Sequence, residues 1–403
     1  MNVQQQHPDA THQQVAASHP ICITVAGNQL TVFTEAAATF AAMIADIRSA
    51  RQLIWMETYI FANDASGQAV ASALIARARD GLDVRLLYDA VGSKDTPPAF
   101  FKAMQAAGVK LHEFHSLWEG VRKFSPLRML NRRDHRKLLI IDDAAAYFGG
   151  MNIVDHGRDF NFIGISEDAA PTIGWRDLHL RLTGPQQQEV SQSFLRSWNY
   201  AKGIPMPWRP TEYRRVRLTT TDESIHFFDS GPGLKFSRAP RVYRRLLLGA
   251  QRSVVIAMAY FIPVGRVMTE LMAARHRGVR LTVLVPAKAD VRLAQYATDS
   301  MYRKLLRARF HIYERTNRMM HTKLMIVDRE WCVAGSSNMD PRSLWTNLEF
   351  LAVIRSRPFA AAMSAIARYE LRHSQRVNLA DIARRGRLHR ILSALAWQFR
   401  WWL

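Results

Sequence analysis

Residues 135–152 read HRKLLIIDDAAAYFGGMN, and residues 321–338 read HTKLMIVDREWCVAGSSN. Each stretch starts with His, and Lys, Asp, Gly and Asn follow 2, 7, 14 and 17 positions later. Two stretches with the same internal spacing are not a chance match, and they predict a site built from two equivalent halves. The matched residues are His135, Lys137, Asp142, Gly149 and Asn152 in the first stretch and His321, Lys323, Asp328, Gly335 and Asn338 in the second.

The segments that precede the two stretches also repeat. Apolar runs typical of buried strands alternate with amphipathic runs typical of helices, in the same order in both halves. This pattern predicts an α/β fold in which two similar halves with largely parallel sheets pack about a pseudo-twofold axis, with the active site between them. The predicted strand, helix and strand lie at 53–61, 67–81 and 83–90 in the first half and at 253–263, 268–278 and 279–286 in the second.

Composition divides the chain into four parts. Residues 1–20 are polar and predict a disordered tail. Residues 21–205 and 206–375 are the two halves, and the Pro-containing segment KGIPMPWRPTEY at 202–213 predicts the boundary between them. Residues 376–403 are a basic and aromatic extension that ends in ILSALAWQFRWWL.

The charge of the chain predicts an anionic partner. The chain has 55 Lys and Arg against 34 Asp and Glu, a net charge of +21, which suits both nucleic acid and an anionic lipid surface. No uninterrupted run of about 18 apolar residues occurs, so we expect a protein that is soluble or attached to a membrane surface. The only cysteines, Cys22 and Cys332, exclude a disulfide framework, and their apolar neighbours predict buried thiols in a reducing compartment.

The residue types of the repeated stretches suit a phosphate group. Two His, two Lys and two Asn make a pocket rich in donors, in which the lysines neutralise phosphate oxygens without a metal or another cofactor. Alternation along a strand puts each His and its Lys on one face. One imidazole attacks phosphorus while the other protonates the leaving alkoxide, which predicts a phosphohistidine intermediate. We expect catalytic roles for His135, Lys137, His321 and Lys323 and phosphate contacts from Asn152 and Asn338.

Three carboxylates are candidates for supporting roles. A nucleophilic imidazole needs its second ring nitrogen held, usually by a carboxylate. Glu349 and Asp177 each start a strand-like run after their motif, and we expect Glu349 to orient His321 and Asp177 to orient His135. Glu57 has two interpretations, a carboxylate facing the site or the partner of a basic residue in the sheet, and the sequence does not separate them.

The paired pattern HxKxxxxDxxxxxxG[GS]xN resembles the motif of the phospholipase D superfamily, over about residues 25–375. The resemblance implies a phosphohistidine intermediate, independence of metal, and an active site at the interface of two halves, with His135 favoured as the nucleophile. Its motif also includes Asp142 and Asp328, which we place in the catalytic set as structural supports near the site rather than as proton-transfer groups.

The segments METYIF, AYFIP and GSSNMDPRSLWTNLE narrow the resemblance to bacterial cardiolipin synthases of the short type without N-terminal transmembrane helices. That resemblance implies transfer of a phosphatidyl group, typically from phosphatidylglycerol, to the hydroxyl of another phospholipid. It also implies peripheral attachment to an anionic phospholipid membrane, at the cytoplasmic side of a bacterial cell membrane.

Two segments are candidates for membrane contact. The segment 117–137 mixes basic with bulky apolar residues beside the first motif, and the C-terminal residues 391–403 carry Trp397, Trp401 and Trp402. For the C-terminal segment, packing on the protein's own core is an equal alternative.

Four functions compete: a phosphatidyltransferase, a phospholipase D-type hydrolase that uses water as acceptor, a phosphodiesterase or nuclease, and a catalytically silent binding module. The intact double motif argues against the silent module, and the mixture of aromatic and basic residues argues against a nucleic-acid partner. The acceptor, the choice between transfer and hydrolysis, and the oligomeric state stay open.

Overall fold

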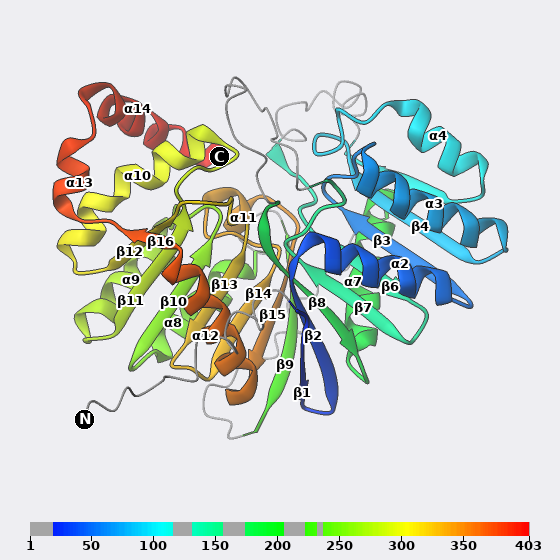
Figure 1. Ribbon diagram of the computed structural model, residues 1–403, viewed down its shortest axis with the longest axis horizontal. Helices are drawn as coiled ribbons and strands as arrows, with labels where there is room; N and C mark the ends of the chain where they lie inside the picture. Colours follow the sequence, from blue (N-terminus) through cyan, green and yellow to red (C-terminus); the bar gives the residue numbers. More distant parts are fainter. Residues whose placement is uncertain (1–18, 116–130, 156–173, 205–221, 232–236, 403) are drawn as a thin grey trace, which may run out of the picture.

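Two eight-stranded sheets lie side by side and share a central layer (Figure 1). The tail predicted at 1–20 and the boundary predicted at 202–213 fall largely outside the residues that the structure describes. This computed structural model describes residues 19–115, 131–155, 174–204, 222–231 and 237–402.

The two sheets have the same internal strand order when one of them is read in reverse. The first reads β1-β2-β8-β7-β6-β3-β4-β5 and the second reads β16-β12-β11-β10-β13-β14-β15-β9, so seven strands of one sheet match seven of the other. This correspondence confirms the prediction of two similar α/β halves. The strands of the first sheet are β1 (Ile21–Val25), β2 (Asn28–Glu35), β3 (Leu53–Thr58), β4 (Asp83–Asp89), β5 (Lys110–Phe114), β6 (Leu138–Ile141), β7 (Ala145–Gly149) and β8 (Arg176–Thr183). Those of the second are β9 (Ser224–Ser230), β10 (Ser253–Met258), β11 (Arg280–Pro286), β12 (His311–Arg315), β13 (Lys323–Val327), β14 (Trp331–Gly335), β15 (Glu349–Arg355) and β16 (Ser374–Arg376).

The prediction of largely parallel sheets is wrong. Only β3, β4 and β5, and likewise β10, β11 and β12, run parallel to one another, and the other pairs are antiparallel. The strand after each His–Lys pair of the motif is followed closely by the next strand: β7 starts at Ala145, after β6 ends at Ile141. A connection this short permits only antiparallel pairing, because a parallel pair needs a crossover of a dozen or more residues.

Helices cover the outer faces of both sheets, and two helices fill the space between them. On the outer side of the first sheet, α2, α3 and α4 pack against residues such as Met56 and Leu86. On the outer side of the second, α8, α9, α10 and α14 pack against residues such as Ile256 and Val283. The central layer holds α7 and α12 (Figure 1). The helices are α2 (Ala36–Ser49), α3 (Ala65–Arg79), α4 (Pro98–Ala106), α7 (Gln187–Ala201), α8 (Ala239–Gly249), α9 (Gly265–His276), α10 (Arg292–Arg307), α11 (Pro341–Trp345), α12 (Arg357–Arg372), α13 (Leu379–Arg384), α14 (Arg387–Gln398) and the 3-10 turn η2 (Arg400–Trp402).

Ion pairs and aromatic packing hold the two halves together. Arg176 of the first half contacts Glu370 of the second at 2.7 Å, and Arg318 of the second contacts Glu35 of the first at 2.8 Å. Phe148 and Phe350 pack edge to face between the sheets with ring centroids 5.5 Å apart. Ion pairs that are largely buried fix geometry more than they add stability, so they hold the halves in one relative position.

Two sequence expectations concern exposure. Cys332 is buried in β14 as predicted, but Cys22 is exposed, because β1 is an edge strand whose alternate residues face solvent. Within the described part of the chain, no helix is both long enough and apolar enough to cross a bilayer.

Candidate active site

Each motif histidine enters the site on a segment that pairs with a strand of the opposite half. The backbone N–H of His135 donates to the carbonyl of Leu348 at 2.9 Å, and the N–H of His321 donates to the carbonyl of Arg176 at 2.7 Å. Asp134 and Met320, which precede the histidines, form parallel bridges to Leu348 and Arg176. The residue after Leu348 is Glu349, and the residue after Arg176 is Asp177. The backbone pairing between the halves therefore places a carboxylate of one half against the imidazole of the other.

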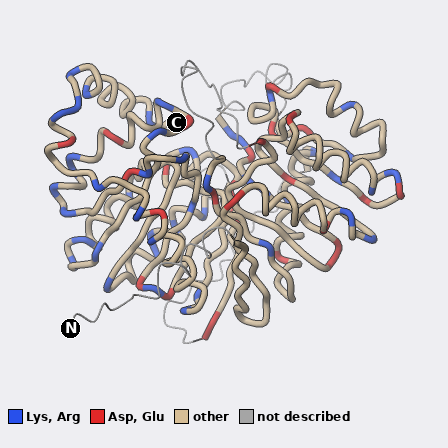
Figure 2. The backbone as a smooth tube through the Cα atoms, viewed as in Figure 1, with Lys and Arg blue, Asp and Glu red and all other residues tan. Residues whose placement is uncertain are grey.

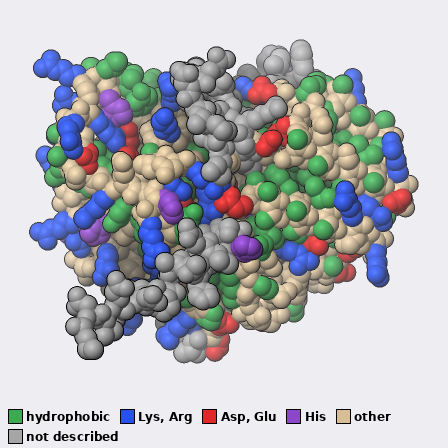
Figure 3. Space-filling view, in the orientation of Figure 1, with side chains coloured by type: hydrophobic (Ala, Val, Ile, Leu, Met, Phe, Trp, Pro, Cys, Tyr) green, Lys and Arg blue, Asp and Glu red, His purple; other side chains and the backbone are tan. Residues whose placement is uncertain are grey.

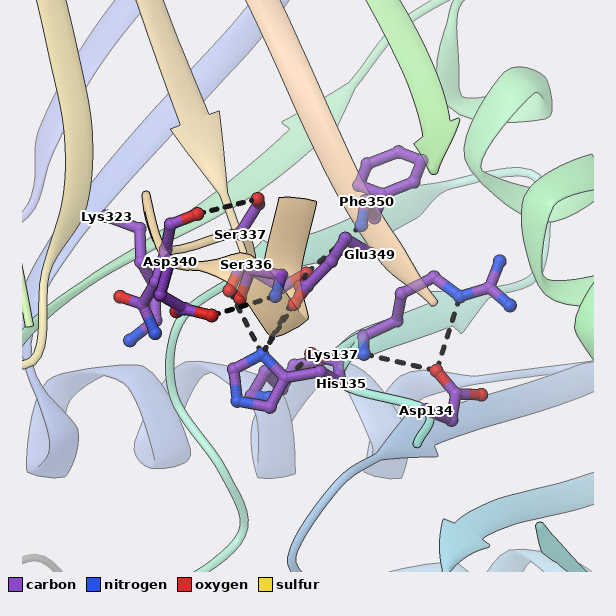
Figure 4. A network of polar contacts seen from close by, with 12 residues as sticks. Asp134, His135, Lys137, Lys323, Ser336, Ser337, Asp340, Glu349 and Phe350 are labelled. Atoms are coloured by element: carbon purple, nitrogen blue, oxygen red, sulfur yellow. Dashed lines mark hydrogen bonds and ion pairs between the residues drawn. The ribbon is translucent and has the colours of Figure 1, made fainter. Parts of the chain in front are cut away.

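The carboxylates accordingly hold the histidines in a crossed arrangement. Nδ1 of His321 lies 2.7 Å from Oδ2 of Asp177. Nδ1 of His135 lies 3.3 Å from Oε2 of Glu349, and it lies 3.1 Å from the carbonyl oxygen of Ser336 (Figure 4). The expectation that each acid orients the histidine of its own half is therefore wrong, because the strand ends that carry the acids cross the pseudo-twofold axis.

The ring tautomer of His135 follows from its neighbours. A backbone carbonyl only accepts hydrogen bonds, so the contact with Ser336 requires His135 to carry its proton on Nδ1. An ionised Asp177 imposes the same tautomer on His321. In both rings this leaves Nε2 as the atom with a lone pair.

Two buried lysines stand beside the imidazoles. Lys323 starts β13, and its Nζ lies 2.8 Å from Nδ1 of His321; Lys137, just before β6, donates to the carbonyl of His135 at 2.6 Å. Burial lowers the pKa of Lys137 to about 7. Burial also lowers the pKa of His135 well below its usual value, and the charges of both lysines add to this effect.

The two carboxylates differ in their protonation. Burial raises the pKa of Glu349 to about 8, so it is mostly protonated at neutral pH. Burial acts in the same direction on Asp177, but the charges of Lys323 and His321 outweigh it and bring the pKa of Asp177 down to about 2. The pseudo-symmetric halves are thus chemically unequal: His321 faces a carboxylate anion, and His135 faces a carboxylic acid.

Glycines make room for the strands that carry the acids. A Cβ on Gly150 would lie 2.2 Å from Oδ1 of Asp177, and one on Gly335 would lie 2.1 Å from the carbonyl oxygen of Phe350. A side chain at either position would push away the strand end that carries Asp177 or Glu349. The motif glycine Gly335, and Gly150, which directly follows the motif glycine Gly149, are therefore required by close packing beside the site.

The motif aspartates lie at the other end of their strands from the histidines. The Asp142 carboxylate accepts from the backbone N–H groups of residues 51–53 at 2.8 to 2.9 Å, and Asp328 accepts from those of residues 251–253 at 2.7 to 2.8 Å. The four residues of β6 lie between Lys137 and Asp142, so these two are five residues apart, roughly 16 Å at the usual strand rise. Asp142 and Asp328 are structural supports, as expected, but they bind the backbone at the far ends of their strands rather than near the site.

A cavity of about 420 Å³ opens onto both imidazoles. Asn152 and Asn338 line it, as do His135 and His321. Oδ1 of Asn152 accepts from the N–H of Ile60 at 3.2 Å, whereas Oδ1 of Asn338 is buried without a hydrogen-bond partner among the described residues. This amide oxygen can accept from a donor on a ligand, whereas the expected contact with a phosphate oxygen would come from the N–H₂ group of Asn338. Among the residues that the structure describes, no group of His, Cys, Asp and Glu side chains has the arrangement of a metal site.

Aromatic residues in this cavity were not found from the sequence. The ring of Tyr59 lies 5.2 Å from that of His135, and the rings of Trp175 and Tyr260 lie 5.5 and 6.5 Å from that of His321. The segments METYIF and AYFIP contain both tyrosines, inside the strands predicted at 53–61 and 253–263. The observed strands β3 and β10 end earlier, at Thr58 and Met258, so both tyrosines follow a strand end, which the apolar pattern did not mark. These rings give the walls around the imidazoles an apolar character.

Two other sequence hypotheses are resolved by burial. Glu57 is buried, 3.1 Å from Arg136, and accepts from Ser197 at 2.9 Å, so it is the partner of a basic residue in the core. Of the segment 117–137, a candidate for membrane contact, residues 117–130 lie outside the described residues. Arg133 from that segment is buried against Asp89 at 3.3 Å and does not face a membrane.

Comparison with known proteins matches both halves. Residues 43–163 and 243–369 match the family described as "Cardiolipin synthase, PLD-like domain". The chain is 29% identical to a cardiolipin synthase of Alkalihalophilus pseudofirmus, over 90% of this chain and 70% of that protein. It is 32% identical to a probable cardiolipin synthase of Bacillus subtilis, over 86% of this chain and 67% of that protein.

Solved structures show the same fold at low sequence identity. The phosphatidylserine synthase of Haemophilus influenzae superposes with a TM-score of 0.69 at 14% identity, over 98% of this chain and 99% of that one. A polyphosphate kinase of Porphyromonas gingivalis gives a TM-score of 0.58 at 13% identity, over 87% of this chain and 49% of that one. The arrangement of two packed α/β halves is therefore common to these proteins.

Proposed function

Because the chain belongs to the cardiolipin synthase family of phospholipase D-like proteins, we propose that it transfers a phosphatidyl group from phosphatidylglycerol to the hydroxyl of a second phospholipid. The chain is an enzyme of phosphatidyl transfer. The observation that carries the proposal is the crossed pair of imidazoles in one cavity, each held at Nδ1 by an acid of the other half and each flanked by a buried lysine.

The inequality of the two acids assigns the roles of the two histidines. A nucleophile must be neutral, and His135 has a pKa well below its usual value and faces a mostly protonated Glu349. A general acid must carry a proton. Burial and the charge of Lys323 lower the pKa of His321 as well, though less than that of His135, and the ionised Asp177 opposes this shift by stabilising the imidazolium. The negative charge of the bound phosphodiester further favours this protonation. His135 is thus the nucleophile and His321 the acid and base.

The reaction proceeds in two displacements. Nε2 of His135 attacks phosphorus, the bond from phosphorus to the headgroup oxygen breaks, and His321 gives its proton to the leaving glycerol. Glycerol departs and the phosphatidyl group stays on His135. The hydroxyl of a second phosphatidylglycerol then attacks phosphorus, His321 takes the hydroxyl proton, and the bond to His135 breaks to give cardiolipin.

The lysines and asparagines stabilise the phosphate during both steps. Lys137 and Lys323 are buried beside the imidazoles, and burial lowers the pKa of both. A bound phosphate anion favours their protonated forms, whose charges then act in a medium that screens them weakly. Asn152 and Asn338 add neutral donors from the cavity wall. The aromatic walls formed by residues such as Trp175 and Tyr260 limit the access of water, which favours transfer to a lipid hydroxyl over hydrolysis.

Incubation of the purified protein with labelled phosphatidylglycerol vesicles tests the proposal. Cardiolipin and free glycerol are expected in equal amounts. Phosphatidic acid as the only lipid product would identify a hydrolase, and DNA cleavage without lipid turnover would identify a nuclease. His135→Ala and His321→Ala should each abolish turnover while thermal unfolding shows an intact fold, and retained turnover in either variant would contradict the two-histidine mechanism.

A further inference from the structure

The C-terminal helix α14 and the turn η2 present an apolar surface that no described part of the protein covers. Its first four residues, Leu388, Ile391, Leu395 and Phe399, are spaced three, four and four positions apart, which aligns them along one face of a helix. The side chains of all six residues of this surface are 48% to 70% exposed. The surface, which we call the C-terminal stripe, consists of Leu388, Ile391, Leu395, Phe399, Trp401 and Trp402.

The opposite side of α14 is anchored, so the stripe is held outward. Ser393 and Ala396 are buried where α14 packs along α10. Asp299 of α10 contacts Arg385 at 2.6 Å and His389 at 3.0 Å. These contacts fix the rotation of the helix about its axis. The stripe cannot turn inward without breaking a buried carboxylate's contacts, which is costly.

Cations border the stripe. A groove of about 860 Å³ runs between α10 and α14, and Arg303, Lys304, Arg390 and Arg400 line it. Within the described part of the chain, Arg303, Lys304 and Arg390 form no ion pair, so their charges are available to an external anion. Lys and Arg outnumber Asp and Glu over this half of the molecule (Figure 2), and hydrophobic side chains gather over α14 with Lys and Arg beside them (Figure 3).

The same surface adjoins the mouth of the active site. Trp402, the last residue of the stripe, also lines the cavity that contains His135 and His321. The helix α14 lies at the end of the molecule where β10 and β11 finish and where Tyr260 and Asp290 enter the cavity (Figure 1). A flat partner seated on the stripe would therefore meet the opening to the imidazoles.

We propose that the C-terminal stripe docks the enzyme on a bilayer that contains anionic lipids. The apolar side chains enter the acyl boundary, the flanking cations contact lipid phosphates, and the tryptophans occupy the interfacial zone. The inference rests on the proposed function, because an enzyme whose substrates lie in a bilayer must bring its cavity to that surface. A helix with an apolar stripe bordered by cations complements an anionic bilayer in both polarity and charge.

The test makes two measurements on the parent protein, on a triple variant of the stripe and on a control variant. The variant carries Leu388→Ser, Ile391→Ser and Leu395→Ser, all at exposed positions outside the cavity. The control carries Leu248→Ser, because Leu248 is 50% exposed and lies at the far end of the second sheet, before β10. The first arm measures sedimentation with vesicles of phosphatidylglycerol and phosphatidylcholine. The second measures turnover of short-chain phosphatidylglycerol dispersed in detergent micelles.

We expect the triple variant to lose vesicle affinity by at least about tenfold and to keep its turnover of dispersed substrate. The control should bind vesicles like the parent protein. Unchanged vesicle affinity of the triple variant would overturn the proposal, as would equal affinity of the parent protein for vesicles of phosphatidylcholine alone. A parent protein that is dimeric in analytical ultracentrifugation, with a monomeric triple variant, would show instead that the stripe joins two copies of the chain. The sedimentation arm decides the docking proposal even if the second arm detects no turnover, an outcome that would count against the proposed function alone.

Discussion

Replacing Asp177 with Asn should damage the enzyme more than any comparable change to the other acid. The pKa of Asp177 is about 2 in the folded protein against an ordinary value of 3.8, a difference that corresponds to about 2 kcal/mol of stabilisation of the charged pair. The amide introduced by Asp177→Asn would keep a hydrogen bond to His321 but remove the charge that supports the imidazolium. A loss of about 2 kcal/mol in the transition state slows turnover by at least about thirtyfold.

The same charge contributes to folding. Because the folded pKa of Asp177 lies below the unfolded value, its contribution is present above about pH 3.8 and is lost as the pH falls through about 2. At pH 7 the Asp177→Asn variant should therefore unfold with a free energy lower by about 2 kcal/mol. Urea unfolding at 25 °C measures this change, and turnover is compared only at temperatures where the variant is fully folded.

Glu349→Gln is the matched control for Asp177→Asn. Glu349 has a pKa of about 8, so Gln replaces a group that is already mostly uncharged at pH 7. We expect turnover of dispersed phosphatidylglycerol to fall by less than about fivefold, the scale of one altered neutral hydrogen bond. The reasoning is refuted if the two variants lose activity equally, or if Glu349→Gln is the more damaging change.

Three further predictions follow from the geometry around the site. Gly150→Ala should reduce turnover as strongly as Asp177→Asn, because the added Cβ displaces that carboxylate; Gly386→Ala, with open space around it, should behave like the parent protein, and equal turnover in both alanine variants would contradict this. Asp142→Asn should lower the free energy of unfolding by about 1 to 3 kcal/mol but leave the turnover of the folded fraction unchanged, as measured by denaturant titration beside an activity assay. The acid limb of the kcat/KM profile should lie below pH 6.5, because the lowered pKa of His135 keeps this imidazole neutral down to lower pH. Below pH 6.5 the unfolded state binds more protons than the folded state, so the free energy of unfolding should fall in the same range. An acid limb above pH 6.5 would contradict the assignment of His135 as the nucleophile.

The repeated architecture was predictable because its signals are local. The helices expected at 67–81 and 268–278 correspond to α3 and α9, and the strand starts at 53 and 253 are those of β3 and β10. Periodicity of apolar residues fixes elements of this kind. Strand direction is not local: α/β alternation described only three strands of each sheet. The short connections after β6 and β13 make the pairs β6–β7 and β13–β14 antiparallel.

The membership of the site was predictable, but its pairing was not. The repeated spacing identified both histidines and both lysines, and the position of the acids after their motifs identified Asp177 and Glu349. Spacing measured within each half then suggested the wrong partner for each histidine. The partner depends on backbone pairing across the interface, which no distance along a single half encodes.

The crossed pairing also shows how a duplicated fold would perform the asymmetric reaction proposed above. Each half supplies one imidazole and the acid for the other, so neither half contains a complete acid–histidine pair. Asp177 lies close enough to Lys323 and His321 to stay ionised, whereas the Glu349 side chain is buried without an equally strong cationic partner and takes up a proton. Two halves with the same strand order can therefore hold two histidines with the different roles proposed above, because the difference depends on which acid is ionised rather than on the strand order.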